Sequence, residues 1–339
     1  AEGRAKNHDD AVSKLQKMSA DDIGYYLYHK DAEQIISVFN GGHAGIYESP
    51  RLFQDGVVLP DVPLLDAFGD PRFQSEAPLL IGTNRDEMKL FMMMSPEYVT
   101  MRFGKVPTMR DPKRYEIDSD YFSRMWKAVG VDEPLQRMFR LGKRNVFCYR
   151  FDWDEIPAIP FVRPDLLIGA THAMEIPFVF RDIEGRFNPF RTFTKRNQKS
   201  RIDVTKKMAQ YWTNFAHNGH PNADTNAIDA GKGKQNNNAL PEWNPWQPGT
   251  AANTLVIDAD SEGGIRMEST DVTFETVKNA LRGDKRLAKH DKDRCRLYAQ
   301  MFLGSGLFGH SGSLEEYETF GKRGKAPIPA ATFKSHRLI

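Results

Sequence analysis

The sequence is poor in cysteine and has no long apolar run, and each deficit excludes a class of protein. Only two cysteines, Cys148 and Cys295, occur among the 339 residues. They are too few for a disulfide framework or for a zinc site built from cysteines. No apolar stretch approaches the roughly 18 residues needed to cross a bilayer. The first ten residues, AEGRAKNHDD, are charged and do not resemble a signal peptide.

Neither sign of charge predominates. Lys and Arg number 47 against 45 Asp and Glu, which argues against a nucleic-acid binder that relies on bulk positive charge. Basic runs at 195–201 and 278–294 are typical of solvated surface, since acidic residues interrupt the second. The sequence has no P-loop and no dinucleotide fingerprint, and His217 and His220 lack an acidic third ligand. We therefore expect no nucleic-acid partner, no cofactor and no metal.

Hydrophobic periodicity predicts an α/β protein. Residues 77–82 are apolar on both faces, as in a buried parallel sheet. Met208, Tyr211 and Phe215 recur at helical spacing and predict an amphipathic helix. The expected strands are residues 57–59, 77–82, 145–153 and 254–257. The expected helices are residues 9–39, 108–145, 203–217 and 268–303, with a polar surface loop at 223–240.

Two polar groups follow predicted strands in an order that suggests hydrolysis. An acidic loop comes directly after residues 77–82, and His172 follows a later strand. Reactive groups collect at the carboxyl ends of strands in open α/β sheets, and acid before histidine is the order in α/β-hydrolases. A serine needs a base with a pKa near neutrality, and a carboxylate must orient that base. By spacing alone, a solvated acid and a structural histidine explain the same pattern.

The residue sequences of these segments resemble those of one protein family. LLIGTNRDEMKLF (residues 79–91) resembles the segment that carries the catalytic glutamate of type-B carboxylesterases, the cholinesterase-like family. GATHAMEIPFVF (169–180) resembles the segment that carries its catalytic histidine. FQDGVVLPDVPLLDAF (53–68), NVFCYRFDW (145–153) and MAQYWTNFAHNGHPN (208–222) resemble further blocks of the family. All five occur in the family's order.

The resemblance implies a fold and a site. Residues 1–303 would be the C-terminal part of an α/β-hydrolase domain, with the last strands of a mostly parallel sheet and surrounding helices. Residues 304–339 would form a tail outside it. Glu87 would be the triad acid and His172 the general base. Leu90, Phe91 and Met174 would line the substrate pocket, although core packing explains these three equally well.

Two residues depart from the family's pattern beside the expected site. The family usually has glycine after the triad glutamate, where this chain has Met88, and often has glycine after the histidine, where it has Ala173. Both changes add a side chain and alter the expected pocket, but neither removes a group that transfers protons. Glu175 matches a family glutamate that looks structural.

The expected nucleophile has no counterpart in these 339 residues. An esterase of this kind needs G-x-S-x-G at a strand-to-helix elbow and a Gly-rich oxyanion loop. Residues 309–313 (GHSGS) come closest to the elbow, but they end in serine and follow the histidine. Gly41-Gly42-His43 reverses the His-Gly-Gly order of an oxyanion loop and fits an ordinary turn. We expect an N-terminal segment or a separate chain to supply the serine and the oxyanion hole, and the present sheet to have an unpaired edge.

These observations favour a carboxylic-ester hydrolase that acts on a small-molecule ester. The alternative is a non-catalytic binding or adhesion module, because some family members have that role after losing triad groups. Retention of both Glu87 and His172 favours the enzyme. Secreted animal members depend on several disulfides, which two cysteines do not supply. The sequence therefore favours a bacterial-type, cytoplasmic enzyme but leaves the compartment open, because a signal peptide could lie in the expected N-terminal segment.

Overall fold

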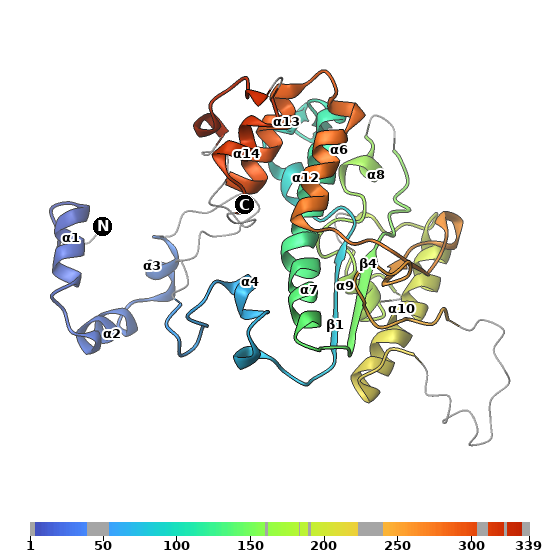
Figure 1. Cartoon of the computed structure of the whole chain (residues 1–339), viewed down its shortest axis with the longest axis horizontal. Helices are drawn as coiled ribbons and strands as arrows, with labels where there is room; N and C mark the ends of the chain where they lie inside the picture. The colour runs from blue at the N-terminus through green and yellow to red at the C-terminus, as the bar shows by residue number, and fades with distance from the viewer. Residues whose placement is uncertain are drawn as a thin grey trace. The chain divides into compact units, whose positions relative to one another are not determined.

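The computed structural model describes residues 4–38, 54–159, 162–182, 184–188, 191–222, 240–303, 311–321 and 324–333. The chain divides into two units, Ala1–Leu52 and Phe53–Ile339 (Figure 1). Each unit is described separately below. The expected surface loop at 223–240 lies almost entirely outside the described residues.

The first unit contains three short helices where the sequence predicts helix over 9–39. They are α1 (His8–Leu15), α2 (Ala20–Tyr28) and α3 (Ala32–Ile36). Capping side chains divide the segment: Asn7 accepts a hydrogen bond at the start of α1, Ser19 at the start of α2, and Asp31 forms a capping box on α3. None of the three helices buries a residue. This unit therefore has no core of its own within its described residues.

The second unit is built on a mixed four-stranded sheet. Its strands are β1 (Leu79–Asn84), β4 (Val146–Phe151), β5 (Thr254–Ile257) and β6 (Arg266–Glu268), in the order β1-β4-β5-β6. The first three are parallel, and β6 is antiparallel to β5. Three of these strands match the predicted ones to within a few residues, and the α/β class is confirmed. Within the described part of the chain β1 is an edge strand.

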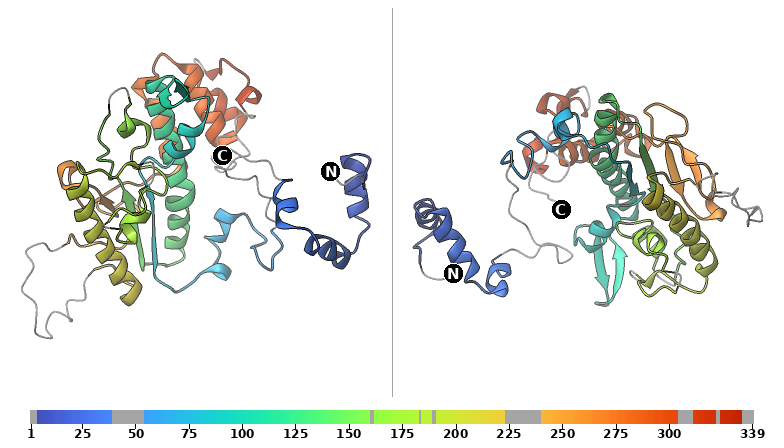
Figure 2. Two further views of the ribbon diagram at one scale, coloured as in Figure 1. Left: turned by 180° about the vertical axis from the view of Figure 1, so that it is seen from behind. Right: turned by 90° about the horizontal axis from the view of Figure 1, so that it is seen from below.

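Helices cover both faces of this sheet (Figure 1 and Figure 2). On one face, α9 (Ile176–Val179) and α10 (Gln198–Asn218) pack over a cluster that includes Phe147 and Leu255. On the other, α7 (Glu133–Arg140) packs over a cluster that includes Val146 and Cys148. Burial of both faces explains why the strands are continuous apolar runs.

A helical cluster lies beside the sheet and forms the largest apolar core. It combines α5 (Lys89–Met94) and α6 (Pro112–Lys127) with α12 (Phe274–Gly283) and α13 (Asp291–Tyr298). The predicted helix over 108–145 is α6 and α7 joined by a π-helical turn, Ala128–Asp132. The helix predicted over 268–303 is interrupted after α12.

The tail beyond residue 304 contributes to this core where it is described. Tyr317, in α14 (Leu314–Glu318), and nearby Phe320 are both buried in the helical cluster. The hydroxyl of Tyr317 donates to the carbonyl of Ile328 at 2.5 Å. The sequence led us to expect a tail outside the domain, whereas these residues pack into the domain.

Two further differences from the predicted elements are local. Residues 57–59 form no strand, because the carboxylate of Asp55 accepts hydrogen bonds from the backbone of Val57, Val58 and Leu59 and folds the segment into a loop. A hairpin of β2 (Val99–Arg102) and β3 (Val106–Met109) was not predicted. The remaining short elements are α4 (Leu64–Ala67), Pro71–Phe73, α8 (Pro164–Leu167), Asp260–Glu262, Lys285–Leu287, Ala299–Leu303 and Ala330–Phe333.

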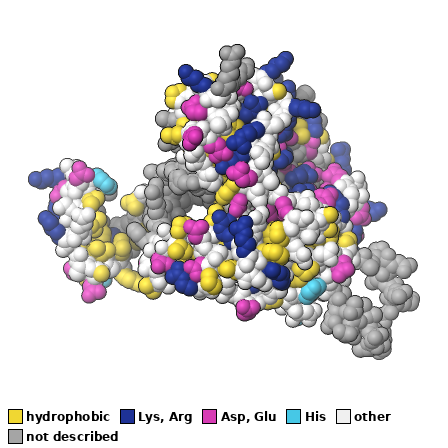
Figure 3. Space-filling model, viewed as in Figure 1, with side chains coloured by type: hydrophobic (Ala, Val, Ile, Leu, Met, Phe, Trp, Pro, Cys, Tyr) yellow, Lys and Arg dark blue, Asp and Glu magenta, His cyan; other side chains and the backbone are white. Residues whose placement is uncertain are grey.

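None of the helices in the described ranges is both long enough and apolar enough to span a membrane. On the face of the molecule seen in Figure 3, basic and acidic side chains are interspersed. This mixture matches the near balance of charges in the sequence.

Candidate active site

Glu87 lies in the turn that follows β1, and its carboxylate is held by the strand from which it emerges. Oε1 accepts hydrogen bonds from the hydroxyl of Thr83 at 3.0 Å and from the backbone N–H of Asn84 at 2.8 Å. Only 6% of the Glu87 side chain is exposed. A buried carboxylate with these donors is fixed in position and has its second oxygen free for another partner.

His172 is that partner. Its Nδ1 lies 2.7 Å from Oε2 of Glu87, although the two residues are 85 positions apart in the sequence. A carboxylate only accepts, so Nδ1 donates and Nε2 of the neutral ring is left as the proton acceptor. The hydrogen bond to Glu87 raises the pKa of His172, and partial burial opposes that rise. Because 41% of the His172 side chain is exposed, its ring is accessible as a base.

The loop that carries His172 is attached to the β1 turn by backbone contacts. The backbone N–H of Asp86 donates to the carbonyl of Ala170 at 3.0 Å, and the N–H of Ala170 donates to the Asp86 carboxylate at 3.1 Å. The amide of Asn84 donates to the carbonyl of Thr171 at 2.7 Å. These contacts fix the residues directly before His172.

Asp86 is held in turn by two cations. Its carboxylate pairs with Lys89 at 3.1 Å and with Arg85 at 3.1 Å, and Lys89 is buried. Burial would raise the pKa of Asp86, but Lys89 and Arg85 outweigh that effect and hold it below its usual range. Gly169 has a φ of +55°, and a Cβ there would lie 2.5 Å from Oδ2 of Asp86. Glycine is therefore required where the two loops meet.

The backbone after His172 is strained. Ala173 has a φ of +68°, a left-handed conformation that suits glycine better than alanine. This is the position where the resembling family often has glycine. Met88, the other departure, is fully buried in the helical cluster, and its backbone N–H donates to the hydroxyl of Ser123. The added side chain of Met88 therefore enters the core.

The three residues expected to line a pocket have different surroundings. The ring of Phe91 lies 5.6 Å from the ring of His172. Leu90 is half-buried against the helical cluster. Met174 has no exposed surface and belongs to the core under α10. The structure therefore gives Met174 a packing position, where its side chain has no surface for a substrate.

Sequence reasoning missed Trp126, which packs edge-on against the His172 ring with 5.2 Å between centroids. Its indole also stacks on Phe91 at 5.7 Å. Trp126 lies on α6, a helix predicted from periodicity alone, and no spacing relates it to His172. It was detectable only from the packing. Asn84, Thr83 and Asp86 were quoted within the resembling segment but were given no role.

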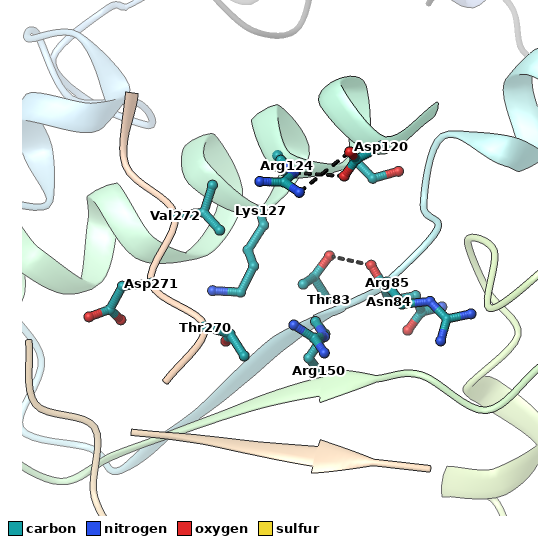
Figure 4. A pocket seen from close by; sticks show the side chains of 11 residues that line it. Thr83, Asn84, Arg85, Asp120, Arg124, Lys127, Arg150, Thr270, Asp271 and Val272 are labelled. Carbon is teal, nitrogen blue, oxygen red and sulfur yellow. Dashed lines mark hydrogen bonds and ion pairs between the residues drawn. The ribbon is translucent and has the colours of Figure 1, made fainter. Parts of the chain in front are cut away.

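A pocket of about 390 Å³ lies at the end of β1, where Thr83, Asn84 and Arg85 line it (Figure 4). Cations from three elements line it, and each is paired with a carboxylate. Arg85 of the β1 turn pairs with Asp86, and Arg124 of α6 with Asp120. Lys127 of α6 pairs with Asp132, and Arg150 of β4 with Asp152. The charge of this pocket is compensated internally, and we assign it no ligand.

The structure provides no nucleophile next to His172 within the residues it describes. Nε2 of His172 has no hydrogen-bond partner among them. Residues 41–43 and 309–310 lie outside the described ranges, and Ser313 caps α14 by accepting a hydrogen bond from Glu316. In the described chain no group of three or more His, Cys, Asp or Glu residues is placed to hold a metal ion.

Comparison with known proteins identifies the family. A family model described as the carboxylesterase family matches residues 105–275, half of the chain. The chain belongs to the carboxylesterase family. Within this member of the family, His172 lies inside the matched range, and Glu87 lies ahead of it.

The relatives are longer than this chain. Human cocaine esterase is 33% identical over 140 residues, which are 41% of this chain and 23% of that protein. A PNB esterase structure aligns with a TM-score of 0.40 and 19% identity over 77% of this chain and 48% of its own. A carboxylesterase of Geobacillus stearothermophilus aligns with a TM-score of 0.44 and 21% identity over 79% of this chain and 49% of its own. The chain thus spans under a quarter of the curated relative and about half of these solved esterases.

Proposed function

We propose that this chain supplies the acid and the base of a serine carboxylesterase. Glu87 is the triad acid and His172 the general base. The observation that carries the proposal is the hydrogen bond of 2.7 Å between Nδ1 of His172 and the buried carboxylate of Glu87. That bond sets the tautomer in which Nε2 accepts a proton, and the half-exposed ring presents Nε2 to a substrate. No cofactor is needed for this chemistry.

The reaction follows from these roles. Nε2 of His172 takes the proton of a serine hydroxyl as the serine oxygen attacks the ester carbonyl, and Glu87 stabilises the imidazolium. The imidazolium then gives its proton to the departing alkoxide, which leaves as an alcohol, and the acyl group remains bonded to the serine oxygen. Water attacks the acyl group while His172 takes its proton. Return of that proton to the serine oxygen releases the carboxylic acid.

We propose that the serine and the oxyanion hole come from outside these 339 residues, on an N-terminal segment or a separate chain. The sequence contains no G-x-S-x-G. β1 is an edge strand in the described sheet, so its outer edge is available for another strand. A sheet that lacks its neighbours exposes unpaired backbone and apolar surface. If the chain alone hydrolysed p-nitrophenyl esters, this part of the proposal would be wrong.

The substrate we propose is a small carboxylic ester with an apolar group. Phe91 and Leu90 lie on α5 directly after Glu87, and Phe91 contacts the His172 ring. Apolar side chains beside the base favour an apolar acyl or alcohol group. Met174 is left out of this proposed pocket because its side chain is fully buried.

The test is hydrolysis of p-nitrophenyl esters by the chain together with the serine-bearing partner. H172A should lower kcat by about a thousandfold or more, as loss of a triad base does. H290A is the matched control, because His290 is exposed at the start of α13, and it should keep full activity. Equal activity of H172A and H290A would remove His172 from the role. A partner that lacks a nucleophilic serine would favour the non-catalytic binding module.

A further inference from the structure

Asn84 is the last residue of β1 and contacts both halves of the proposed acid–base pair. Its backbone N–H donates to Oε1 of Glu87 at 2.8 Å. Its side-chain amide donates to the carbonyl of Thr171 at 2.7 Å and to Oε2 of Glu175 at 2.5 Å. Only 2% of Asn84 is exposed. One buried residue is therefore bonded to the acid and to the residues on each side of His172.

The contacts join segments that are distant in the sequence. Thr171 and Glu175 lie 87 and 91 positions from Asn84. No covalent geometry fixes the loop of His172 relative to Glu87, so side-chain tethers must do so. Ala173, between the two tethered residues, has a strained backbone. That strain costs free energy, so contacts such as those of Asn84 are needed to hold the loop in this conformation.

The chemistry of asparagine fits this position. The amide nitrogen has two N–H donors, and both acceptors lie on its side. If the amide were reversed, Oδ1 would face the carbonyl of Thr171 and the carboxylate of Glu175, two acceptors. Within the described residues Oδ1 has no partner, so the donors alone determine the orientation. Aspartate lacks these donors, and alanine lacks any polar group.

We propose that Asn84 is a positioning residue for His172, which sets the contact between Nδ1 and Glu87 by holding the loop at Thr171 and Glu175. This inference rests on the proposed function of the Glu87–His172 pair. Asn84 touches neither the proposed nucleophile nor the base itself. Its effect should therefore appear as a change in the titration of His172.

A second effect acts in the same direction. Burial raises the pKa of Glu175, and the hydrogen bond from Asn84 opposes that rise. Loss of the amide would favour the neutral form of Glu175. The charge of Glu175 contributes to the raised pKa of His172, so both consequences of losing Asn84 lower the pKa of His172.

The test is an NMR titration of His172 in the 339-residue chain, with its signal assigned from H172A. E87Q sets the scale, because it removes the carboxylate that raises the pKa of His172. N84A should lower this pKa in the same direction as E87Q and by a smaller amount. Y211F is the matched control, because it removes one buried hydrogen bond elsewhere, from the Tyr211 hydroxyl to the carbonyl of Pro241 at 2.5 Å. It should leave the pKa unchanged.

An unchanged pKa in folded N84A, with E87Q shifted, would overturn the inference and leave Asn84 a packing residue. If N84A does not fold, N84S, which keeps one hydroxyl donor, must lower the pKa in the same direction, and no shift in that variant overturns the inference equally. The titration measures no hydrolysis. An inactive assembly with a shifted pKa in N84A would therefore contradict the proposed function while supporting the role of Asn84.

Discussion

The turn that carries Glu87 and the loop that carries His172 are held in opposite ways. Glu87 takes its donors from Thr83 and Asn84, within four positions of itself, and its side chain is 6% exposed. His172 and its loop are held by contacts with residues more than 80 positions away in the sequence, and the His172 side chain is 41% exposed. The acid is thus preorganised by local structure, whereas the base is positioned by the tertiary fold. Damage to the tethers should affect the histidine side first.

Removal of the Asp86 carboxylate should cause the largest loss of stability, because this carboxylate holds the His172 loop. Asp86→Ala removes the acceptor of the Ala170 N–H and leaves buried Lys89 without its nearest carboxylate. Breaking one side of a buried ion pair costs about 3–5 kcal/mol, so we expect the free energy of unfolding to fall by about 3 kcal/mol or more. Urea denaturation with an unchanged m-value is the measurement.

The control for this change is Asp165→Ala. Asp165 pairs with Arg163 at the surface, and a surface pair contributes about 0–1 kcal/mol. Equal losses from the two variants would show that the Asp86 contacts do not hold the loop.

A smaller loss of stability should follow when one of the donors to the Glu87 carboxylate is removed. Thr83→Val keeps the shape of the side chain but removes one of the two donors to Oε1 of Glu87. A hydrogen bond to a buried charged group contributes about 1.5–3 kcal/mol, so the free energy of unfolding should fall by about 2 kcal/mol. Thr83→Ser, which keeps the hydroxyl, is the control in the same denaturation experiment. A Val variant as stable as the Ser variant would contradict the hydrogen bond.

Replacing the strained residue beside His172 with glycine should raise the stability of the chain. Ala173→Gly relieves a φ of +68°, and alanine in a left-handed conformation costs more than glycine by about 0.5–1 kcal/mol. Thermal denaturation should show a higher Tm. The same substitution at Ala128, which has a helical φ of −56°, should instead lower stability by about 1 kcal/mol. A loss at both positions would mean that Ala173 is not strained.

Several parts of the fold could be read from the sequence. The strands β1, β4 and β5 are continuous apolar runs, and burial on both faces makes such runs visible. The helix predicted over 203–217 lies within α10 (Gln198–Asn218). The hairpin of β2 and β3 was missed because each strand has four residues and one contains Pro107.

The contact between Glu87 and His172 was expected from the sequence, and the two side chains lie 2.7 Å apart. Glu87 and His172 could be named because each follows a strand and lies in a segment whose sequence resembles the type-B carboxylesterases. Trp126 and the role of Asn84 could not be named, because both depend on contacts between segments that only the folded chain brings together. For Met174 the sequence left a pocket position and a core position equally open, and its side chain is buried in the core under α10.

The most direct measurement of the Glu87–His172 contact is the pH dependence of stability in the wild-type chain and in E87Q. The pKa of His172 is raised in the folded state, so the contact stabilises fully below the unfolded pKa of about 6.5 and is lost as pH rises through the folded pKa. Between about pH 5 and pH 9, the stability of the wild type relative to E87Q should therefore be greatest at the acidic end and decline with rising pH. A difference that does not change with pH would contradict a carboxylate of Glu87 bonded to the imidazole of His172.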